Sequence, residues 1–277
     1  MEPPPPLKLN LWKPEPVESP IDELITFAPN IAACTKRGPV RQSNEDRVGF
    51  LSIQGETCLR LCAVMDGHGG AEFSDYLKQN LAALGTKLKQ VDLEGSKTII
   101  TEELIRLEQS AKHLEGGTCF LLMVESATQL LFANTGDCCA IILNKDGSMT
   151  LPVQKHAPEQ EGELKRINSA NLRVSSGRVW NESGEVGLNV SRSMGDFQLK
   201  GKPEDPHLQA VTVVPEFICV DKDKVHKCLL ISDGILESLR DIEVLALMSL
   251  GDTAEDIVNK AIQENSTDNC SALLMTL

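Results

Sequence analysis

Two aspartates in this sequence each stand directly after a short apolar run and directly before a glycine. Asp66 follows the run at 61–65, and Asp233 follows the run at 228–232. Because such runs are typical of buried strands, we expect both carboxylates at strand ends, with their oxygens facing a cleft. Carboxylate oxygens that converge in this way are the ligands that Mg²⁺ and Mn²⁺ prefer. The pattern therefore indicates a divalent-metal site.

Two more aspartates fit the same arrangement. Asp137 follows the apolar segment 131–136, and Asp268 directly precedes the last predicted strand. Asp-Gly is also the commonest turn dipeptide, and we interpret Asp146 as such a turn because it lies between two short alternating strands. Asp66 and Asp233 differ from it because a helical pattern follows each of them. The dipeptide alone leaves a turn and a metal ligand both open.

A histidine and an arginine near these carboxylates could act on a substrate. His68 lies two residues after Asp66 in a loop whose other positions are glycines, so its imidazole is available for proton transfer near neutral pH. Arg41 lies five residues before Asp46, and a guanidinium suits a bidentate grip on a phosphate. Single residues of these types are more often structural or exposed, so both roles are hypotheses.

Several other hydrolytic machineries are absent from the sequence. It contains no Gly-x-x-x-x-Gly-Lys-Ser/Thr phosphate loop and no Gly-x-Ser-x-Gly nucleophile elbow. No cysteine begins a five-residue phosphate loop closed by arginine, and histidine-rich metal pairs are also missing. These absences favour a hydrolase built on carboxylate ligands.

Composition narrows the possible partners and compartments. The 277 residues carry a formal charge of −13, which argues against nucleic acid as a partner. No apolar run is long enough to span a membrane, and the start of the sequence does not resemble a signal segment. Several of the nine cysteines, such as Cys62 and Cys228, lie inside apolar runs, which is typical of reduced, buried thiols. No Cys-x-x-Cys pair is present, which argues against a structural zinc site. We therefore expect an intracellular protein, cytoplasmic in the first place, with the nucleus as the alternative.

The chain divides into an arm and one domain. Residues 1–22 are rich in proline and are expected to form a flexible arm that could bind a protein partner. Residues 23–277 are expected to form one α+β domain of antiparallel sheets with helices on their outer faces. In it, residues 155–185 are interpreted as a loop-dominated insert and 211–214 as a strand. Helices are expected near 236–250 and 252–264, the second with a capping box from Asp252 to Glu255.

Taken in order, the motifs resemble those of the protein phosphatase 2C (PP2C) family of metal-dependent Ser/Thr phosphatases. Any one of these motifs is weak, whereas five in the right order are specific. They are RQSNEDR at 41–47, MDGHGG at 65–70, GGT at 116–118, NVSRSMGDF at 189–197, and SDGI at 232–235 together with TDN at 267–269.

The resemblance implies a fold, a reaction and a set of roles. The fold would be an α-β-β-α sandwich of two antiparallel sheets, and residues 155–185 would be a variable flap that selects substrates. The reaction would be hydrolysis of phosphoserine and phosphothreonine in proteins by a water activated by two Mg²⁺ or Mn²⁺ ions, without a phospho-enzyme. Arg41 would bind the substrate phosphate and His68 would protonate the leaving oxygen. The implied metal ligands are Glu45, Asp46, Asp66, the Gly67 carbonyl, Asp233 and Asp268.

A weaker third metal is implied at Asp137 and Glu237, where this sequence departs from the family pattern. The arginine common after the Gly-Asp pair is missing, since Cys138 and Cys139 follow Asp137. Glu237 replaces an aspartate, which places its carboxylate one methylene further out. Two hypotheses follow: an active metal-dependent phosphatase, or a phosphatase-like module that binds partners without turnover. Retention of the carboxylates favours the first, because without cations they would repel one another.

Overall fold

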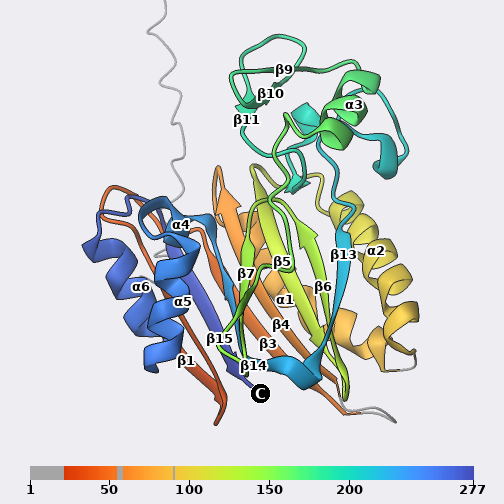
Figure 1. Cartoon of the computed structure of the whole chain (residues 1–277). Helices are drawn as coiled ribbons and strands as arrows, with labels where there is room; N and C mark the ends of the chain where they lie inside the picture. Colours follow the sequence, from red (N-terminus) through yellow and green to blue (C-terminus); the bar gives the residue numbers. More distant parts are fainter. Residues whose placement is uncertain (1–21, 55–58, 90) are drawn as a thin grey trace, which may run out of the picture.

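The computed structural model describes residues 22–54, 59–89 and 91–277. The predicted arm at 1–22 lies outside these ranges except for Asp22, which begins the first strand. Two antiparallel sheets pack face to face, with helices on both outer faces (Figure 1). The predicted α+β sandwich is therefore confirmed.

Each of the two sheets has six strands. The first sheet runs in the order β1 (Asp22–Ala28), β2 (Ile31–Lys36), β15 (Cys270–Thr276), β14 (Val225–Ile231), β7 (Cys139–Asn144) and β8 (Met149–Thr150). The second runs in the order β13 (Glu216–Asp221), β6 (Gln129–Thr135), β5 (Gly117–Glu125), β4 (Leu59–His68) and β3 (Arg47–Ile53), with β12 (Met194–Gly195) paired to β5.

Helices cover the outer face of each sheet. The helices α1 (Glu72–Leu88) and α2 (Leu93–Ser110) pack on the second sheet. The first sheet is covered by α4 (Asp233–Ser238), α5 (Asp241–Leu250) and α6 (Ala254–Gln263). No helix in the described ranges is long and apolar enough to span a bilayer.

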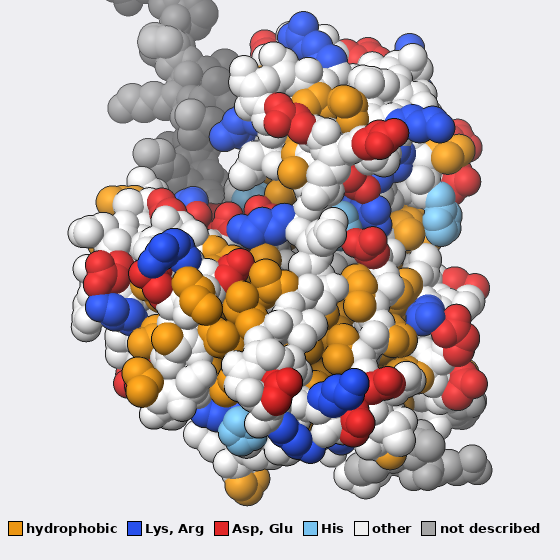
Figure 2. Space-filling model, viewed as in Figure 1, with side chains coloured by type: hydrophobic (Ala, Val, Ile, Leu, Met, Phe, Trp, Pro, Cys, Tyr) orange, Lys and Arg blue, Asp and Glu red, His pale blue; other side chains and the backbone are white. Residues whose placement is uncertain are grey.

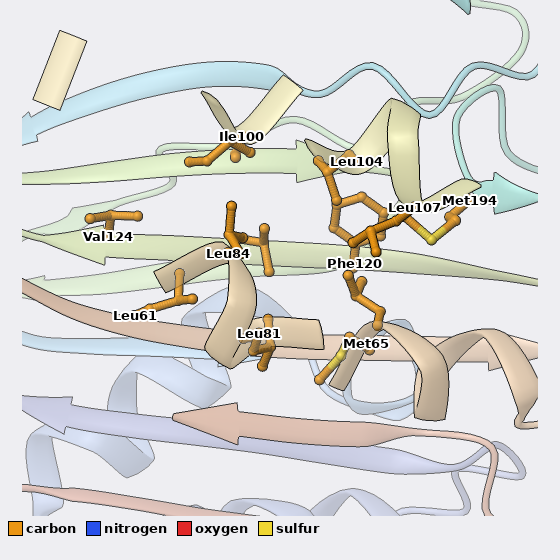
Figure 3. Close-up of a cluster of buried hydrophobic side chains, with 14 of the residues drawn as sticks. Leu61, Met65, Leu81, Leu84, Ile100, Leu104, Leu107, Phe120, Val124 and Met194 are labelled. Atoms are coloured by element: carbon orange, nitrogen blue, oxygen red, sulfur yellow. The ribbon is translucent and has the colours of Figure 1, made fainter. Parts of the chain in front are cut away.

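The strand β5 shows why the sequence contains long apolar runs. All nine of its residues are buried. Side chains alternate between the faces of a strand, so Phe120 and Val124 contact the layer of α1 and α2, whereas Leu121 and Met123 contact the layer between the sheets. Figure 3 shows Phe120 beside the helix residues Leu104 and Leu107 of the outer layer, with Val124 farther along the same strand. A strand covered on both faces is therefore apolar over most of its length, here at 119–124.

A separate lobe lies beyond one end of the sheets, at the top of Figure 1. We call it the flap lobe, residues 161–188 and 197–211. It contains α3 (Glu161–Ser169) and a three-stranded sheet of β9 (Arg173–Ser175), β10 (Arg178–Trp180) and β11 (Gly187–Leu188). Its small core is formed by Ile167, Ala170, Leu172, Val179, Leu199, Ala210 and Val211.

The insert at 155–185 consists of loops and turns around α3, β9 and β10, and α3 was not predicted because its buried side is only Glu163 and Ile167, which lacks an apolar period. Two other details of the sequence-based prediction are wrong. Residues 211–214 form no strand and contribute a single bridge from Thr212 to Arg192. The expected helix at 236–250 is two helices, α4 and α5, separated by extended backbone.

The capping box of the following helix is also displaced by one residue. The expected box ran from Asp252 to Glu255, whereas the structure pairs Thr253 with Asp256 at the start of α6. The Asp256 N–H donates to Thr253 Oγ1 (3.2 Å), and the Thr253 N–H donates to Asp256 Oδ2 (2.9 Å). Both of these backbone donors, which the helix itself would leave unpaired, are therefore satisfied.

Glu163 ties α3 to the rest of the domain. Its carboxylate accepts hydrogen bonds from Arg166 Nη2 (2.7 Å), Arg192 Nη2 (2.6 Å) and Ser191 Oγ. Burial alone would raise the pKa of Glu163, but the hydrogen bonds from Arg166 and Arg192 outweigh burial and hold it well below its usual range. The two arginines also donate to backbone carbonyls at 209–214, so one carboxylate joins several segments.

We expect Glu163→Ala to destabilise the protein by about 3–5 kcal/mol, because it leaves two largely buried guanidinium groups without their carboxylate. The matched control is Glu161→Ala, an exposed glutamate on the same helix. Chemical denaturation at neutral pH measures the difference. A glutamate whose pKa is lowered in the folded state stabilises the fold at pH values above its pKa in the unfolded chain, about 4.3. This contribution is lost as the pH falls. The difference between Glu163→Ala and wild type should therefore shrink on acidification; a constant difference would contradict the assignment.

Candidate metal centre

Three carboxylates from different elements converge at the ends of the two sheets. Asp66 lies near the end of β4, Asp137 lies in the turn between β6 and β7, and Asp233 is the first residue of α4. One oxygen from each lies within 4.8 Å of the others. The Asp233 N–H also lies 3.4 Å from Asp66 Oδ2. The structure thus brings together three residues that the sequence singled out.

Asp46 and Asp268 lie in the same charged neighbourhood. Asp46 is only 1% exposed, and burial followed by the charges of Asp233 and Asp268 raises its pKa to about 7. Burial and the charge of Asp233 likewise raise the pKa of Asp268. Asp46 Oδ2 is buried and has no hydrogen-bond partner among the described residues.

These carboxylates fit a divalent metal. Burial raises the pKa of Asp66 well above its usual value, and the charges of Asp46, Asp233 and Asp137 raise it further. A buried charge and an unpartnered buried oxygen are both costly unless a cation or a donor compensates them. The donors are carboxylate oxygens, without cysteine or histidine in the cluster, which suits Mg²⁺ or Mn²⁺.

The glycines after Asp66 and Asp233 leave room for the backbone of neighbouring segments. A Cβ at Gly67 would lie 2.5 Å from the Glu45 carbonyl oxygen. A Cβ at Gly234 would lie 2.1 Å from the Asn269 carbonyl oxygen, next to Asp268. Real Cβ atoms do not approach so closely. Close packing therefore requires glycine in these two Asp-Gly dipeptides. In Asp146-Gly147, by contrast, a Cβ at Gly147 would meet no atom within 4 Å.

Arg47 holds the loop that carries Glu45 and Asp46. Its Nη1 donates to the carbonyls of Asn44 and Asp46, each at 2.8 Å. Its Nε and Nη2 donate to the two carboxylate oxygens of Asp75 on α1, at 2.6 and 2.9 Å. This bidentate pair fixes the loop against the first helix. The Glu45 carboxylate itself is half-buried and is not one of the three that converge.

Arg41 lies at the mouth of the site. Its side chain is 47% exposed, and its Nη2 pairs with Asp268 Oδ2. Arg41 and the three converging carboxylates line one pocket of about 220 Å³, which we call the metal pocket. Arg178, from β10 of the flap lobe, lines the same pocket. Two guanidinium groups therefore face the carboxylates. In Figure 2, acidic, basic and histidine side chains gather where the flap lobe meets the sheets.

Glu237 holds the loop of Asp268 and is not among the converging carboxylates. Its Oε2 accepts hydrogen bonds from the backbone N–H groups of Thr267 (2.8 Å) and Asp268 (3.0 Å) and from Ser266 Oγ (3.0 Å). Its Oε1 accepts one from Thr267 Oγ1 (2.7 Å). Both oxygens are engaged. The extra methylene, compared with aspartate, lets the carboxylate reach this loop.

The turn that carries Asp137 lacks the arginine expected after the Gly-Asp pair, and no other basic side chain takes its place there. Cys138 and Cys139 are buried, so no charged side chain projects from either position. Gly136, at φ +115°, lies against Cys119, since a Cβ there would lie 2.3 Å from its Sγ. The Gly136 N–H lies 3.1 Å from Nδ1 of the buried His156. The turn is therefore fixed by packing and by backbone hydrogen bonds.

His68 forms a hydrogen-bonded pair with a residue that we did not predict. Its Nε2 lies 2.8 Å from Asp196 Oδ2, which also accepts from Ser193 Oγ. Burial lowers the pKa of His68, but the hydrogen bond and charge of Asp196 outweigh burial and raise it. A carboxylate can only accept, so Nε2 carries the proton in this pair and Nδ1 is left for other partners.

Gly116 and Gly117 leave the space that His68 and Asp196 occupy, since a side chain at either glycine would collide with this pair. A Cβ at Gly117 would lie 2.2 Å from Asp196 Oδ2 and 2.7 Å from His68 Nε2. Gly116 has φ +73°, and a Cβ there would lie 2.4 Å from the His68 carbonyl oxygen. Asp196 itself adopts the left-handed region, at φ 50°. Asp196 lies within a motif that we noted, but only its position in space reveals its partner.

The comparisons with known proteins agree with this geometry. The family model "Protein phosphatase 2C" matches residues 34–270. "Protein phosphatase 1L" from Bos taurus is 28% identical over 267 residues, 89% of this chain and 72% of that protein. "Probable protein phosphatase 2C 59" from Oryza sativa subsp. japonica is 29% identical, over 87% of this chain and 72% of that protein. The solved structure of a serine-threonine phosphatase 2C from Toxoplasma gondii has a TM-score of 0.73 at 14% identity, and the match covers 93% of this chain and 99% of that chain.

We expect Glu237→Gln to weaken Mn²⁺ binding by about 10–100-fold, the usual effect of removing a group that orients a metal ligand. The number of bound ions should stay the same. Calorimetric titration with Mn²⁺ measures both quantities, and Glu102→Gln, at an exposed glutamate on α2, is the control. A fall in the number of bound ions at unchanged affinity would show instead that Glu237 is itself a ligand.

Proposed function

The chain belongs to the protein phosphatase 2C family, and from this premise we propose that it hydrolyses phosphoserine and phosphothreonine in proteins, using two Mg²⁺ or Mn²⁺ ions. The observation that carries the proposal is the convergence of Asp66, Asp137 and Asp233 beside the buried, unpartnered oxygen of Asp46. This arrangement is costly for a domain that binds no cation, which favours an active centre over a binding module without metals.

The proposed ligand set extends the observed cluster. Asp66, Glu45, the Gly67 carbonyl, Asp233 and Asp268 would hold the two ions. Asp46 would act directly or through water. Bound there, the ions would lower the pKa of a water molecule and offset charge on the phosphoryl oxygens. Of the two residues implied for a weaker third ion, Asp137 faces the cluster, while Glu237 is occupied by the 266–268 loop.

Arg41 and Arg178 would hold the phosphate of the substrate. Both line the metal pocket, and a planar guanidinium binds two phosphate oxygens at once. Arg41 is paired with Asp268 and half exposed, so it can exchange this partner for a phosphate at small cost. Arg178 comes from the flap lobe, so phosphate binding would involve both parts of the domain.

His68 would deliver the proton that the leaving oxygen needs. The hydrogen bond from Nε2 to Asp196 orients the imidazole and favours its protonated form, and it leaves Nδ1 to hand on a proton. Asp196 acts through His68 and is therefore a positioning residue. Ser193 keeps the Asp196 carboxylate in place by donating to the same oxygen.

The central experiment compares hydrolysis of p-nitrophenyl phosphate and of a phosphothreonine peptide with Mn²⁺ and with excess chelator. We expect activity only with the metal. Asp66→Asn should lower kcat about a hundredfold or more, because the ions supply several kcal/mol of transition-state stabilisation. Asp146→Asn is the matched control, since Asp146 also precedes a glycine but lies in a turn outside the carboxylate cluster. Wild type that behaves like Asp66→Asn would mean that the chain is a non-catalytic module.

The role of His68 predicts a difference between substrates. His68→Ala should slow the phosphothreonine peptide about 100-fold or more, the lower range for general acid catalysis, and should slow p-nitrophenyl phosphate much less. The aryl phosphate is affected less because nitrophenolate is a good leaving group that needs little protonation. Asp196→Asn should also lower kcat for the peptide more than for p-nitrophenyl phosphate, but by a smaller factor than His68→Ala does. Equal slowing of both substrates would count against His68 as the acid.

A further inference from the structure

A second, larger pocket adjoins the metal pocket. It has a volume of about 490 Å³, which is in the range of about 300–1,000 Å³ typical of ligand sites. His68 and Leu188 line both pockets, so the two are continuous around the imidazole. We call the larger one the flanking pocket. One wall comes from the segment after α2 and the other from the flap lobe.

The flanking pocket combines apolar walls with negative charge. Its apolar side chains are Leu114, Val186, Leu188, Phe197 and Leu199. Its two carboxylates are Glu115 and Asp196, and its lining includes no lysine or arginine. Asp196 is engaged with His68. Glu115 is exposed and forms no hydrogen bond or ion pair with any other residue that the structure describes. One carboxylate at an apolar pocket is therefore available to a ligand.

The position of His68 determines where a substrate chain must run. On the proposed function, on which this inference rests, the phosphate lies in the metal pocket and its leaving oxygen faces His68. The polypeptide that carries this oxygen therefore continues past the imidazole. The flanking pocket begins at that point, since His68 is in its lining.

We propose that the flanking pocket binds a lysine or arginine side chain close in sequence to the phosphorylated serine or threonine. Such side chains have an apolar stem and a charged end. The stem would lie over Leu114, Val186 and Phe197, and the charged end would meet Glu115. An acidic residue in the same place would be repelled by Glu115, and a small residue would leave the apolar walls exposed. The pocket thus makes basic phosphosites the preferred substrate class.

A peptide panel tests this preference. The peptides share one phosphothreonine in a background of alanine and glycine, and a single lysine or a single glutamate is moved through the flanking positions. Mn²⁺-dependent kcat/KM is measured for each peptide and divided by kcat/KM for p-nitrophenyl phosphate, which carries no flanking residue and no positive charge. Binding of fluorescent versions is measured by anisotropy, so the pocket is tested even where turnover is slow.

We expect a lysine at one flanking position to raise the ratio about fivefold over glutamate, as for a favourable exposed ion pair. Glu115→Lys should reverse this order at the same position, so that the glutamate peptide becomes the better substrate and ligand. The matched control is Glu102→Lys, an exposed glutamate on α2 outside the pocket, which should keep the wild-type order.

The outcomes separate this inference from the proposed function. Metal-dependent hydrolysis of the aryl phosphate without any preference among the peptides would overturn the flanking-pocket proposal and leave the phosphatase intact. A lysine preference that Glu115→Lys does not change would also overturn it, because the preference would arise elsewhere. Absence of all metal-dependent hydrolysis would reject the proposed function, while anisotropy would still show whether lysine peptides bind through Glu115.

Discussion

Mutual repulsion among clustered carboxylates is the constraint around which this domain is organised. Asp46 is buried and Asp66 and Asp233 are half-buried, and the charges of Asp46 and Asp233 raise the pKa of Asp66. Left to itself, such a cluster would push the strand ends apart. The frame resists because the carboxylates come from both sheets, whose strands are covered by packed side chains on each face. Core packing therefore supplies the free energy that holds the charges in place.

The groups around the cluster show how its geometry is maintained. Arg47 joins the Asp46 loop to α1, and Glu237 joins the Asp268 loop to α4. Gly67 and Gly234 let the segments that carry Glu45 and Asp268 pass at distances that any Cβ would forbid. The backbone thus fixes where these carboxylates lie, so the proposed ions would not have to order them alone.

The sequence predicted features that depend on residues close together in the chain. It did not predict those that depend on contacts between distant segments. Asp66 and Asp233 could be found because an apolar run ends directly before each of them. The helix α3 could not, since its buried side consists of Glu163 and Ile167. The apolar run at 211–214 was misleading because Val211 packs in the flap lobe while Val213 packs between the sheet and α2. The pair of His68 and Asp196 spans 128 residues of sequence, which no spacing rule reaches.

The flap lobe has a small core of its own, distinct from the three layers of the sandwich. Leu188 is the residue that packs against both this core and the layer between the sheets. Most substitutions within the lobe therefore need no compensating change in the sandwich. On the proposed function, substitutions can therefore change the surface proposed to meet a substrate chain, including Val186, while the residues around Asp66 stay the same. Substrate recognition and the proposed reaction would then be free to diverge at different rates within one polypeptide.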